Sequence, residues 1–122
     1  MMAAFAGGTG AQSEDEVRLL VVAAVRSRRP VRAVYQEHER EFCPHVIGRN
    51  RKGQWRVFAY QYGGSSRSVL ADKGGWRCLA VSELSRVALL DDSWHTAPHE
   101  PQWCVMDVEA DADHPDEPQN GQ

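Results

Sequence analysis

The chain has 122 residues, of which 42% are hydrophobic and 25% charged, as expected for one small globular domain. No apolar run approaches the roughly 20 residues that a membrane-spanning helix needs. The first ten residues also lack the basic and apolar regions of a secretory signal. We therefore expect a cytoplasmic protein, with residues 1–12 as a disordered tail.

Charge is distributed unevenly along the chain. All fourteen Lys and Arg residues lie between Arg18 and Arg86, and the stretch Val17–Leu90 holds only five acidic residues, which gives it a net charge of +9. From Asp91 onward there are nine acidic residues and no Lys or Arg. A basic body favours an anionic partner, and its excess of Arg over Lys suits bidentate binding of phosphate or carboxylate. A solvated surface with a solubilising tail is the alternative.

Residues Ser13–Arg29 are predicted to form a helix. Ser13 and Glu16 have the spacing of a capping box, and Pro30 prevents continuation. Apolar residues recur at helical spacing and should be buried as one stripe. The stripe consists of Val17, Leu20, Val21, Ala24 and Val25.

Short β-like runs separated by turn residues follow the helix. The expected main strands are Val31–Tyr35, Arg40–Ile47, Gln54–Tyr62, Trp76–Val81 and Arg86–Leu90. A weak strand at Ser68–Ala71, and turns at Gly48–Gly53 and Gly63–Ser66, complete the pattern. We therefore predict a mostly β fold with one N-terminal α-helix, in which five strands form a small barrel; closure would leave no exposed sheet edge.

The predicted domain spans residues 13–91. Residues 92–108 should form a C-terminal extension, in which Trp103–Val108 is a possible edge strand. Residues 109–122 are acidic, contain Pro and lack aromatic residues, so we expect a disordered tail.

A succession of spaced residues resembles the WYL domain family. It comprises Val34–Tyr35, Arg40, Phe42, Pro44, Ile47–Gly48, Gly53–Val57, Ala59–Tyr60, Trp76–Arg77 and Leu84–Val87. The namesake triplet departs from the family, because Trp55 is followed by Arg56 and Val57. The resemblance implies a stand-alone member without the winged-helix DNA-binding part, and an Sm-like (SH3-like) barrel that senses or binds ligands such as nucleotides or nucleic acid.

The residues themselves indicate a similar chemistry. Along one strand the side chains should alternate between two faces, with Trp55, Val57 and Ala59 on one and Arg56, Phe58, Tyr60 and Tyr62 on the other. Phe58 is expected to be a core residue. Arginine beside exposed aromatic rings suits phosphate binding with base stacking. The candidate ligand-binding residues are Arg40, Arg56, Tyr60, Tyr62, Arg67 and Arg77. The alternative is that the aromatic residues are core and the arginines only cover the barrel.

Other chemistry is weakly represented. Gly63–Ser66 is more consistent with a flexible loop than with an anion cradle, and His95 and His99 are not accompanied by the paired ligands of structural zinc. The three cysteines have no CxxC pair and are expected to be buried thiols in a reducing cytosol. We predict no catalytic residue, no metal and no cofactor, and hence not an enzyme.

Two functions remain open. The first is a regulatory or sensor module for an anionic ligand, either a nucleotide or single-stranded nucleic acid. The second is a protein-interaction or homo-oligomerisation module that uses a barrel edge, with Trp103–Val108 as the candidate strand. The acidic tail could also cover the arginines as a charge mimic of the ligand, or serve solubility alone. No membrane partner is expected.

Overall fold

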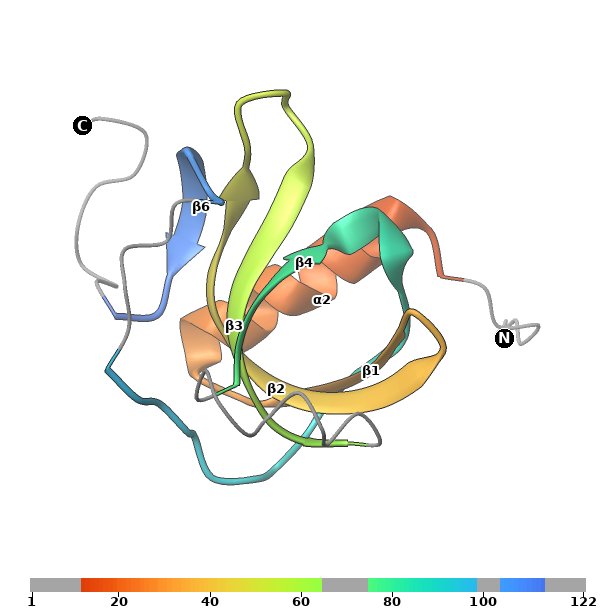
Figure 1. Ribbon diagram of the computed structural model, residues 1–122, viewed down its shortest axis with the longest axis vertical. Coiled ribbons are helices and arrows are strands. Elements are labelled where there is room, and N and C mark those ends of the chain that lie inside the picture. Colours follow the sequence, from red (N-terminus) through yellow and green to blue (C-terminus); the bar gives the residue numbers. More distant parts are fainter. Residues whose placement is uncertain (1–11, 65–74, 99–103, 114–122) are drawn as a thin grey trace.

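The computed structural model describes residues 12–64, 75–98 and 104–113 of the chain (Figure 1). A single described helix, α2, precedes a set of antiparallel strands. In chain order the elements are α2 (Glu14–Ser27), β1 (Val31–Tyr35), β2 (His38–Arg49), β3 (Trp55–Gly64), β4 (Trp76–Ala80), the 3-10 turn η2 (Val81–Glu83), β5 (Leu84–Leu89) and β6 (Asp107–Asp111).

The helix begins where the sequence predicts. The Ser13 hydroxyl accepts a hydrogen bond from the Glu16 amide at 3.0 Å, and the Glu16 carboxylate accepts one from the Ser13 amide at 2.8 Å, which completes the capping box. At the other end Arg28 adopts a left-handed conformation, with φ 55°, and stops the helix before Pro30. The predicted stripe is confirmed: Val17, Val21, Ala24 and Val25 are buried, and Leu20 is partly buried.

The first hairpin joins β1 to β2 by a two-residue turn. Tyr35 pairs with His38, and the intervening Gln36 and Glu37 have φ values of 52° and 69°. Two successive left-handed residues have the sign of twist that connects adjacent antiparallel strands tightly. The strand predicted from Arg40 therefore starts two residues earlier, at His38, and the turn is only Gln36–Glu37.

The strands form one antiparallel sheet of order β4-β3-β2-β1-β5, and β6 pairs with β2. The mostly β fold with one described helix is thus confirmed. Closure of five strands into a barrel is not: in the described part of the chain β4 pairs only with β3 and β5 only with β1, so the sheet is open.

β2 is long enough to pair with two strands, β1 and β6, along the same edge. Its first half pairs with β1 from Val31↔Phe42 to Tyr35↔His38, and its second half pairs with β6 from Val46↔Asp111 to Arg49↔Asp107. The C-terminal strand expected at Trp103–Val108 therefore lies a few residues further along. Residues 109–113, expected to be disordered, are ordered instead, because Ala110 and Ala112 are buried in the main core.

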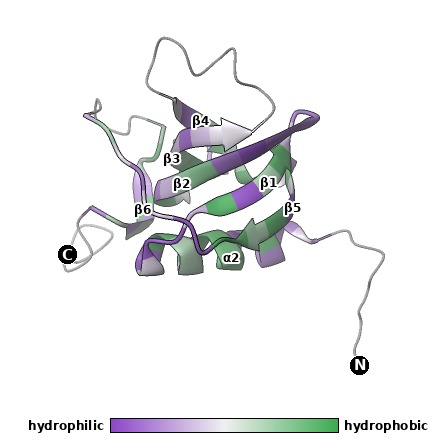
Figure 2. Cartoon of the chain, turned by 90° about the horizontal axis from the view of Figure 1, so that it is seen from below, coloured by the Kyte–Doolittle hydropathy of each residue, from purple (hydrophilic) through white to green (hydrophobic). Residues whose placement is uncertain are grey.

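Two apolar clusters lie on opposite sides of the sheet. On the side that we call the core side, α2 packs against β2, β5 and β6 (Figure 2). The other, outer side carries a smaller cluster made of Val46, Phe58, Cys104 and Val105. The outer cluster is closed by the C-terminal extension, by which we mean the described residues 92–98 and 104–113.

The cysteine prediction is partly wrong. Cys78 on β4 and Cys104 in the C-terminal extension form a disulfide with a Cα–Cα separation of 6.4 Å, while Cys43 is a buried thiol. The two half-cystines are 26 residues apart in sequence. They meet only because the extension folds back beside β4, a long-range contact that the spacing of the cysteines does not reveal.

None of the described helices is long and apolar enough to span a membrane. Several predictions concern residues outside the described ranges and stay untested. They are the tail at residues 1–11, the loop and weak strand within residues 65–74 that include Arg67, and the chain from residue 114 onward.

Candidate anion-binding site

The turn between β2 and β3 presents two exposed cations. The Asn50 side-chain oxygen accepts hydrogen bonds from the backbone amides of Lys52 and Gln54, at 2.9 and 3.0 Å. Gly53 closes the turn with φ 79°, a conformation that disfavours other residues. The turn is therefore fixed by its own hydrogen bonds, and Arg51 and Lys52 are exposed.

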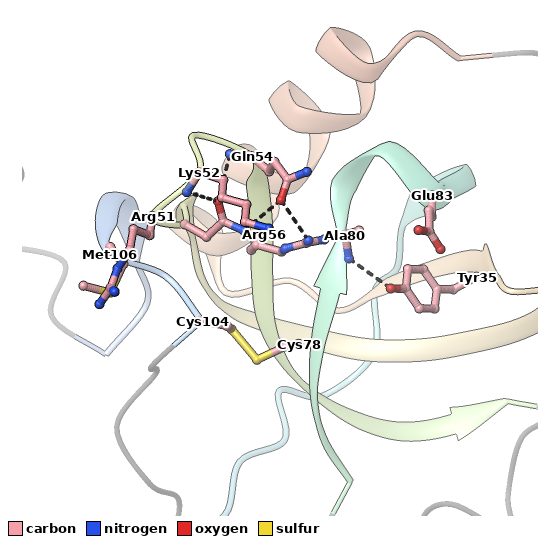
Figure 3. A pocket seen from close by; sticks show the side chains of 11 residues that line it. Tyr35, Arg51, Lys52, Gln54, Arg56, Cys78, Ala80, Glu83, Cys104 and Met106 are labelled. Carbon is pink, nitrogen blue, oxygen red and sulfur yellow. Dashed lines mark hydrogen bonds between the residues drawn. A yellow bond between two sulfur atoms is a disulfide. The ribbon is translucent and has the colours of Figure 1, made fainter.

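Arg56 is oriented by the same turn. Its guanidinium donates to the Gln54 side-chain oxygen at 3.2 Å, and that oxygen also accepts from the Asn50 side-chain amide at 3.1 Å. In Figure 3 the Arg56 side chain extends from β3 toward Ala80 on β4. A partly buried, hydrogen-bonded guanidinium loses less side-chain entropy on binding an anion than a fully mobile one.

These three cations line a cleft of about 650 Å³ (Figure 3). Tyr35 and Ala80 form another part of its wall, where the Ala80 amide donates to the Tyr35 hydroxyl at 3.1 Å. The complete lining is Tyr35, Asn50, Arg51, Lys52, Gln54, Arg56, Cys78, Ala80, Glu83, Cys104 and Met106. Glu83 is the one acidic residue among these lining residues, so the cleft has a formal net charge of +2. Such a surface attracts anions.

A smaller cavity of about 350 Å³ adjoins the cleft and shares Gln54, Arg56, Ala80 and Glu83 with it. Its other lining residues include Trp55. The guanidinium carbons of Arg18 and Arg49 lie 5.0 and 5.5 Å from the centre of the Trp55 ring. Trp55 is thus held by two cations and is already engaged within the protein.

Of the residues predicted from the sequence, Arg56 lies in the cleft, but Arg40 does not. Arg40 is only 7% exposed; it donates to the Tyr35 carbonyl and to the Gln61 side-chain oxygen, each at 3.2 Å. Its pairing with Ala33, a core residue, places it on the core side of the sheet. Burial lowers the pKa of Arg40.

Arg77 lies near Arg40 rather than near Arg56. It pairs with Ala59, another core residue, and its guanidinium donates to the Trp76 carbonyl at 2.8 Å. Burial lowers the pKa of Arg77, and repulsion from the Arg40 charge lowers it further. Arg40 and Arg77 therefore lie close together, but neither of them lines the cleft with Arg56.

The two predicted tyrosines are covered by the protein itself. Tyr60 is half-buried and meets Trp76 edge-on, with ring centroids 5.2 Å apart. Tyr62 stacks on His95 of the C-terminal extension, and its hydroxyl donates to Asp92 at 2.8 Å. Burial, followed by this hydrogen bond and the Asp92 charge, raises the pKa of Tyr62. Phe58 is buried, as predicted, and stacks on Trp76.

The extension also surrounds a buried histidine that sequence reasoning missed. His45 is fully buried, with its Nδ1 3.1 Å from an Asp113 carboxylate oxygen and its Nε2 3.2 Å from the His95 carbonyl. Both ring nitrogens therefore lie within hydrogen-bond distance of an acceptor oxygen. Trp76 and Trp94 pack on the ring. These contacts hold the extension against β2. Because His45 is fully buried, its side chain is not accessible to a ligand.

Two acids of the C-terminal extension form pairs outside the cleft. Asp107 pairs with Arg49, and Asp113 pairs with His45. Neither acid lines the cleft. The part of the tail that the structure describes is therefore structural, and it does not cover Arg51, Lys52 or Arg56.

Arg51 and Lys52 are not among the ligand-binding residues predicted from the sequence, in which they belong to the expected turn Gly48–Gly53. Their signal was the presence of three cations in GRNRKG, directly before a strand that carries Arg56. No group of three or more His, Cys, Asp or Glu side chains within the described ranges is arranged to hold a metal ion.

No family model matches the chain, and no curated protein matches it either.

Proposed function

We propose that the protein is a regulatory ligand-binding module that holds an anionic ligand, a nucleotide or single-stranded nucleic acid, in the cleft without transforming it. The observation that carries the proposal is the grouping of Arg51, Lys52 and Arg56 around a cleft of about 650 Å³. A cavity of this size is within the range of small-molecule sites. Guanidinium and ammonium donors are the groups that bind phosphate in proteins.

The proposed site differs from the face expected from the sequence. Arg56 remains its centre, whereas Arg51 and Lys52 replace the pair Arg40 and Arg77. The aromatic component of the original hypothesis is reduced to Tyr35, whose hydroxyl already accepts a backbone hydrogen bond. Phosphate binding is therefore the larger contribution in this proposal, and base stacking the smaller.

A WYL-type, Sm-like domain is part of the same proposal. The order β4-β3-β2-β1-β5, the preceding helix and the 3-10 turn between β4 and β5 support it. A cytoplasmic location is also proposed, on the basis of composition. Disulfides rarely persist in that compartment, because cellular thiols reduce them. The Cys78–Cys104 bond would therefore be exposed to reduction there.

A titration of labelled nucleotides and single-stranded oligonucleotides tests the proposal. Fluorescence anisotropy should detect binding at about 50 mM salt, and raising the salt to about 200 mM should weaken it steeply for an oligonucleotide that contacts several cations. A mononucleotide with fewer phosphates should show the smaller salt dependence. Absence of binding by every such ligand at low salt would remove the proposal.

Homo-oligomerisation is the second candidate function. β4 and β5 are the edge strands of the sheet, and each has one strand partner within the described residues. A second chain could pair with the other edge of either strand. The Gln12 side chain exchanges two hydrogen bonds with the Val87 backbone and blocks one position of the β5 edge. The strand expected to mediate oligomers is instead bonded to β2. Size-exclusion chromatography with light scattering distinguishes a monomer from an edge-paired oligomer.

A further inference from the structure

The Cys78–Cys104 disulfide is placed where a small molecule can reach it. Both half-cystines line the cleft, and Figure 3 shows the bond between β4 and the segment that leads to Met106. Cys78 is half-buried, whereas Cys104 is only 7% exposed. An incoming nucleophile therefore meets Cys78 more readily than Cys104.

The surroundings of the bond favour one class of nucleophile. Disulfides are cleaved by thiolates, and the leaving group is also a thiolate. Arg51, Lys52 and Arg56 line the same cleft as the bond. Positive charge attracts an anionic thiol during its approach and stabilises the thiolate that leaves.

We propose that Cys78–Cys104 is a thiol–disulfide exchange site whose reductant is a low-molecular-weight thiol that carries additional negative charge, such as a carboxylate or sulfonate. The reductant's thiolate attacks the Cys78 sulfur, forms a mixed disulfide with it and releases the Cys104 thiolate. A second reductant thiolate attacks the reductant's own sulfur in the mixed disulfide and releases the Cys78 thiolate. Two thiols are thereby oxidised to one disulfide, and the protein disulfide takes up two electrons.

Reduction has a structural consequence because the bond holds one wall of the cleft. The segment Cys104–Met106 lies between the disulfide and β6. Besides the bond, it is held by packing of Cys104 and Val105 in the outer cluster and by a hydrogen bond from the Met106 amide to the Arg49 carbonyl at 2.8 Å. Loss of the covalent tie leaves these contacts alone to hold the wall, so its amides should open more often.

The exchange site does not rest on the proposed ligand function. Its tests measure reduction rates and amide protection, and neither requires a nucleotide to bind. If nucleotides fail to bind while anionic thiols remain preferred, the ligand proposal is removed and the exchange site stands.

Reduction kinetics test the chemistry. The full chain is reduced with 2-mercaptoethanesulfonate, neutral 2-mercaptoethanol or cationic cysteamine, and each rate is divided by that thiol's rate on a neutral reference disulfide. At low ionic strength the normalised rate should be at least about threefold higher for the anionic than for the neutral thiol, and lowest for the cationic one. High salt should remove the difference. Equal normalised rates would overturn the proposal.

Matched variants locate the effect. The triple variant Arg51→Gln, Lys52→Gln, Arg56→Gln should lose the preference for the anionic thiol. A control with the same change in net charge, Arg26→Gln, Arg32→Gln, Arg86→Gln, alters exposed cations that do not line the cleft and should retain it. Loss of the preference in both variants would contradict a role for the cleft and assign the effect to overall charge.

Hydrogen exchange tests the structural consequence. In the reduced protein the amides of residues 105–108 should exchange at least about tenfold faster than in the oxidised protein, while those of Val21 and Ala24 in α2 keep their protection. The double variant Cys78→Ser, Cys104→Ser should resemble the reduced protein. If it does not fold, the comparison of oxidised and reduced wild-type chains decides alone. Equal protection of residues 105–108 in those two states would overturn the release of the wall.

Discussion

The phenol ring of Tyr62 stacks on the imidazole of His95, with ring centroids 4.1 Å apart and planes 16° from parallel. The contact joins β3 to the C-terminal extension and occupies a ring that the sequence assigns to ligand stacking. The extension therefore packs on the ring at the position where the sequence-based hypothesis expected a ligand.

Tyr62→Phe should destabilise the protein but leave ligand affinity unchanged. The substitution removes the hydrogen bond to Asp92, for which a loss of about 1 kcal/mol is expected. Tyr60→Phe is the matched control, because no hydrogen bond of its hydroxyl is seen within the described residues; its effect should be smaller. Urea unfolding measures the first effect and nucleotide titration the second. A large loss of affinity for Tyr62→Phe would return Tyr62 to the ligand site.

Stability should fall at alkaline pH partly because of Cys43. Burial is the main reason that the pKa of the Cys43 thiol rises from 9.0 to about 11. The folded protein keeps this thiol protonated, whereas the unfolded chain ionises it near pH 9, so its contribution is complete below pH 9 and is lost as pH rises to about 11.

Cys43→Ala should lower the free energy of unfolding near neutral pH, because it removes buried volume. It should also weaken the pH dependence of that free energy between about pH 9 and 11, because no thiol is left to ionise. Urea unfolding at several pH values between about 8 and 11 measures both effects. Equal slopes for wild type and variant would show that the thiol does not contribute.

Ser13→Ala should destabilise the protein through the helix cap. The Ser13 hydroxyl caps the Glu16 amide, and loss of such a cap costs about 1 kcal/mol. Ser27→Ala is the control: its hydroxyl only bonds back to the Ala23 carbonyl within the same helix, so its effect should be small. Thermal unfolding compares the two variants, and similar losses would mean that the cap has no special role.

Asp113→Asn should cost more stability than Asp91→Asn. Asp113 faces the fully buried His45, and removing the charged partner of a buried imidazole should cost about 1–3 kcal/mol. Asp91 pairs with Arg29 at the surface, where its own side chain is 96% exposed, and such pairs contribute little. Urea unfolding of both variants provides the measurement; the reverse order would contradict an anchoring role for His45.

Local signals in the sequence predicted local structure well. Ser13, Glu16 and Pro30 mark the ends of the helix, and the alternation along Trp55–Phe58 separates core residues from outer ones. Both signals depend only on the geometry of residues that are neighbours in the sequence. The position of Phe58 in the outer cluster confirms that alternation.

The site was predicted less well, because it depends on register between distant strands. Arg40 and Arg77 belong to the core side only because they pair with Ala33 and Ala59, which composition does not reveal. The disulfide partner of Cys104 could not be predicted either, because it depends on the path of the C-terminal extension. A local motif that directly precedes a strand, as with Arg51 and Lys52, is the kind of signal that sequence reasoning could have used.

The most direct test of the proposed cleft is nucleotide and oligonucleotide binding by two charge-matched triple variants at about 50 mM salt. With Arg51→Gln, Lys52→Gln, Arg56→Gln we expect Kd to rise at least about tenfold and the salt dependence to become shallower, since fewer cations contact the phosphates. With Arg26→Gln, Arg32→Gln, Arg86→Gln we expect Kd to stay within about twofold of wild type, since surface charges outside the site act only through weak long-range attraction. Equal weakening by the two variants, or no effect of the first, would contradict an anion site in this cleft.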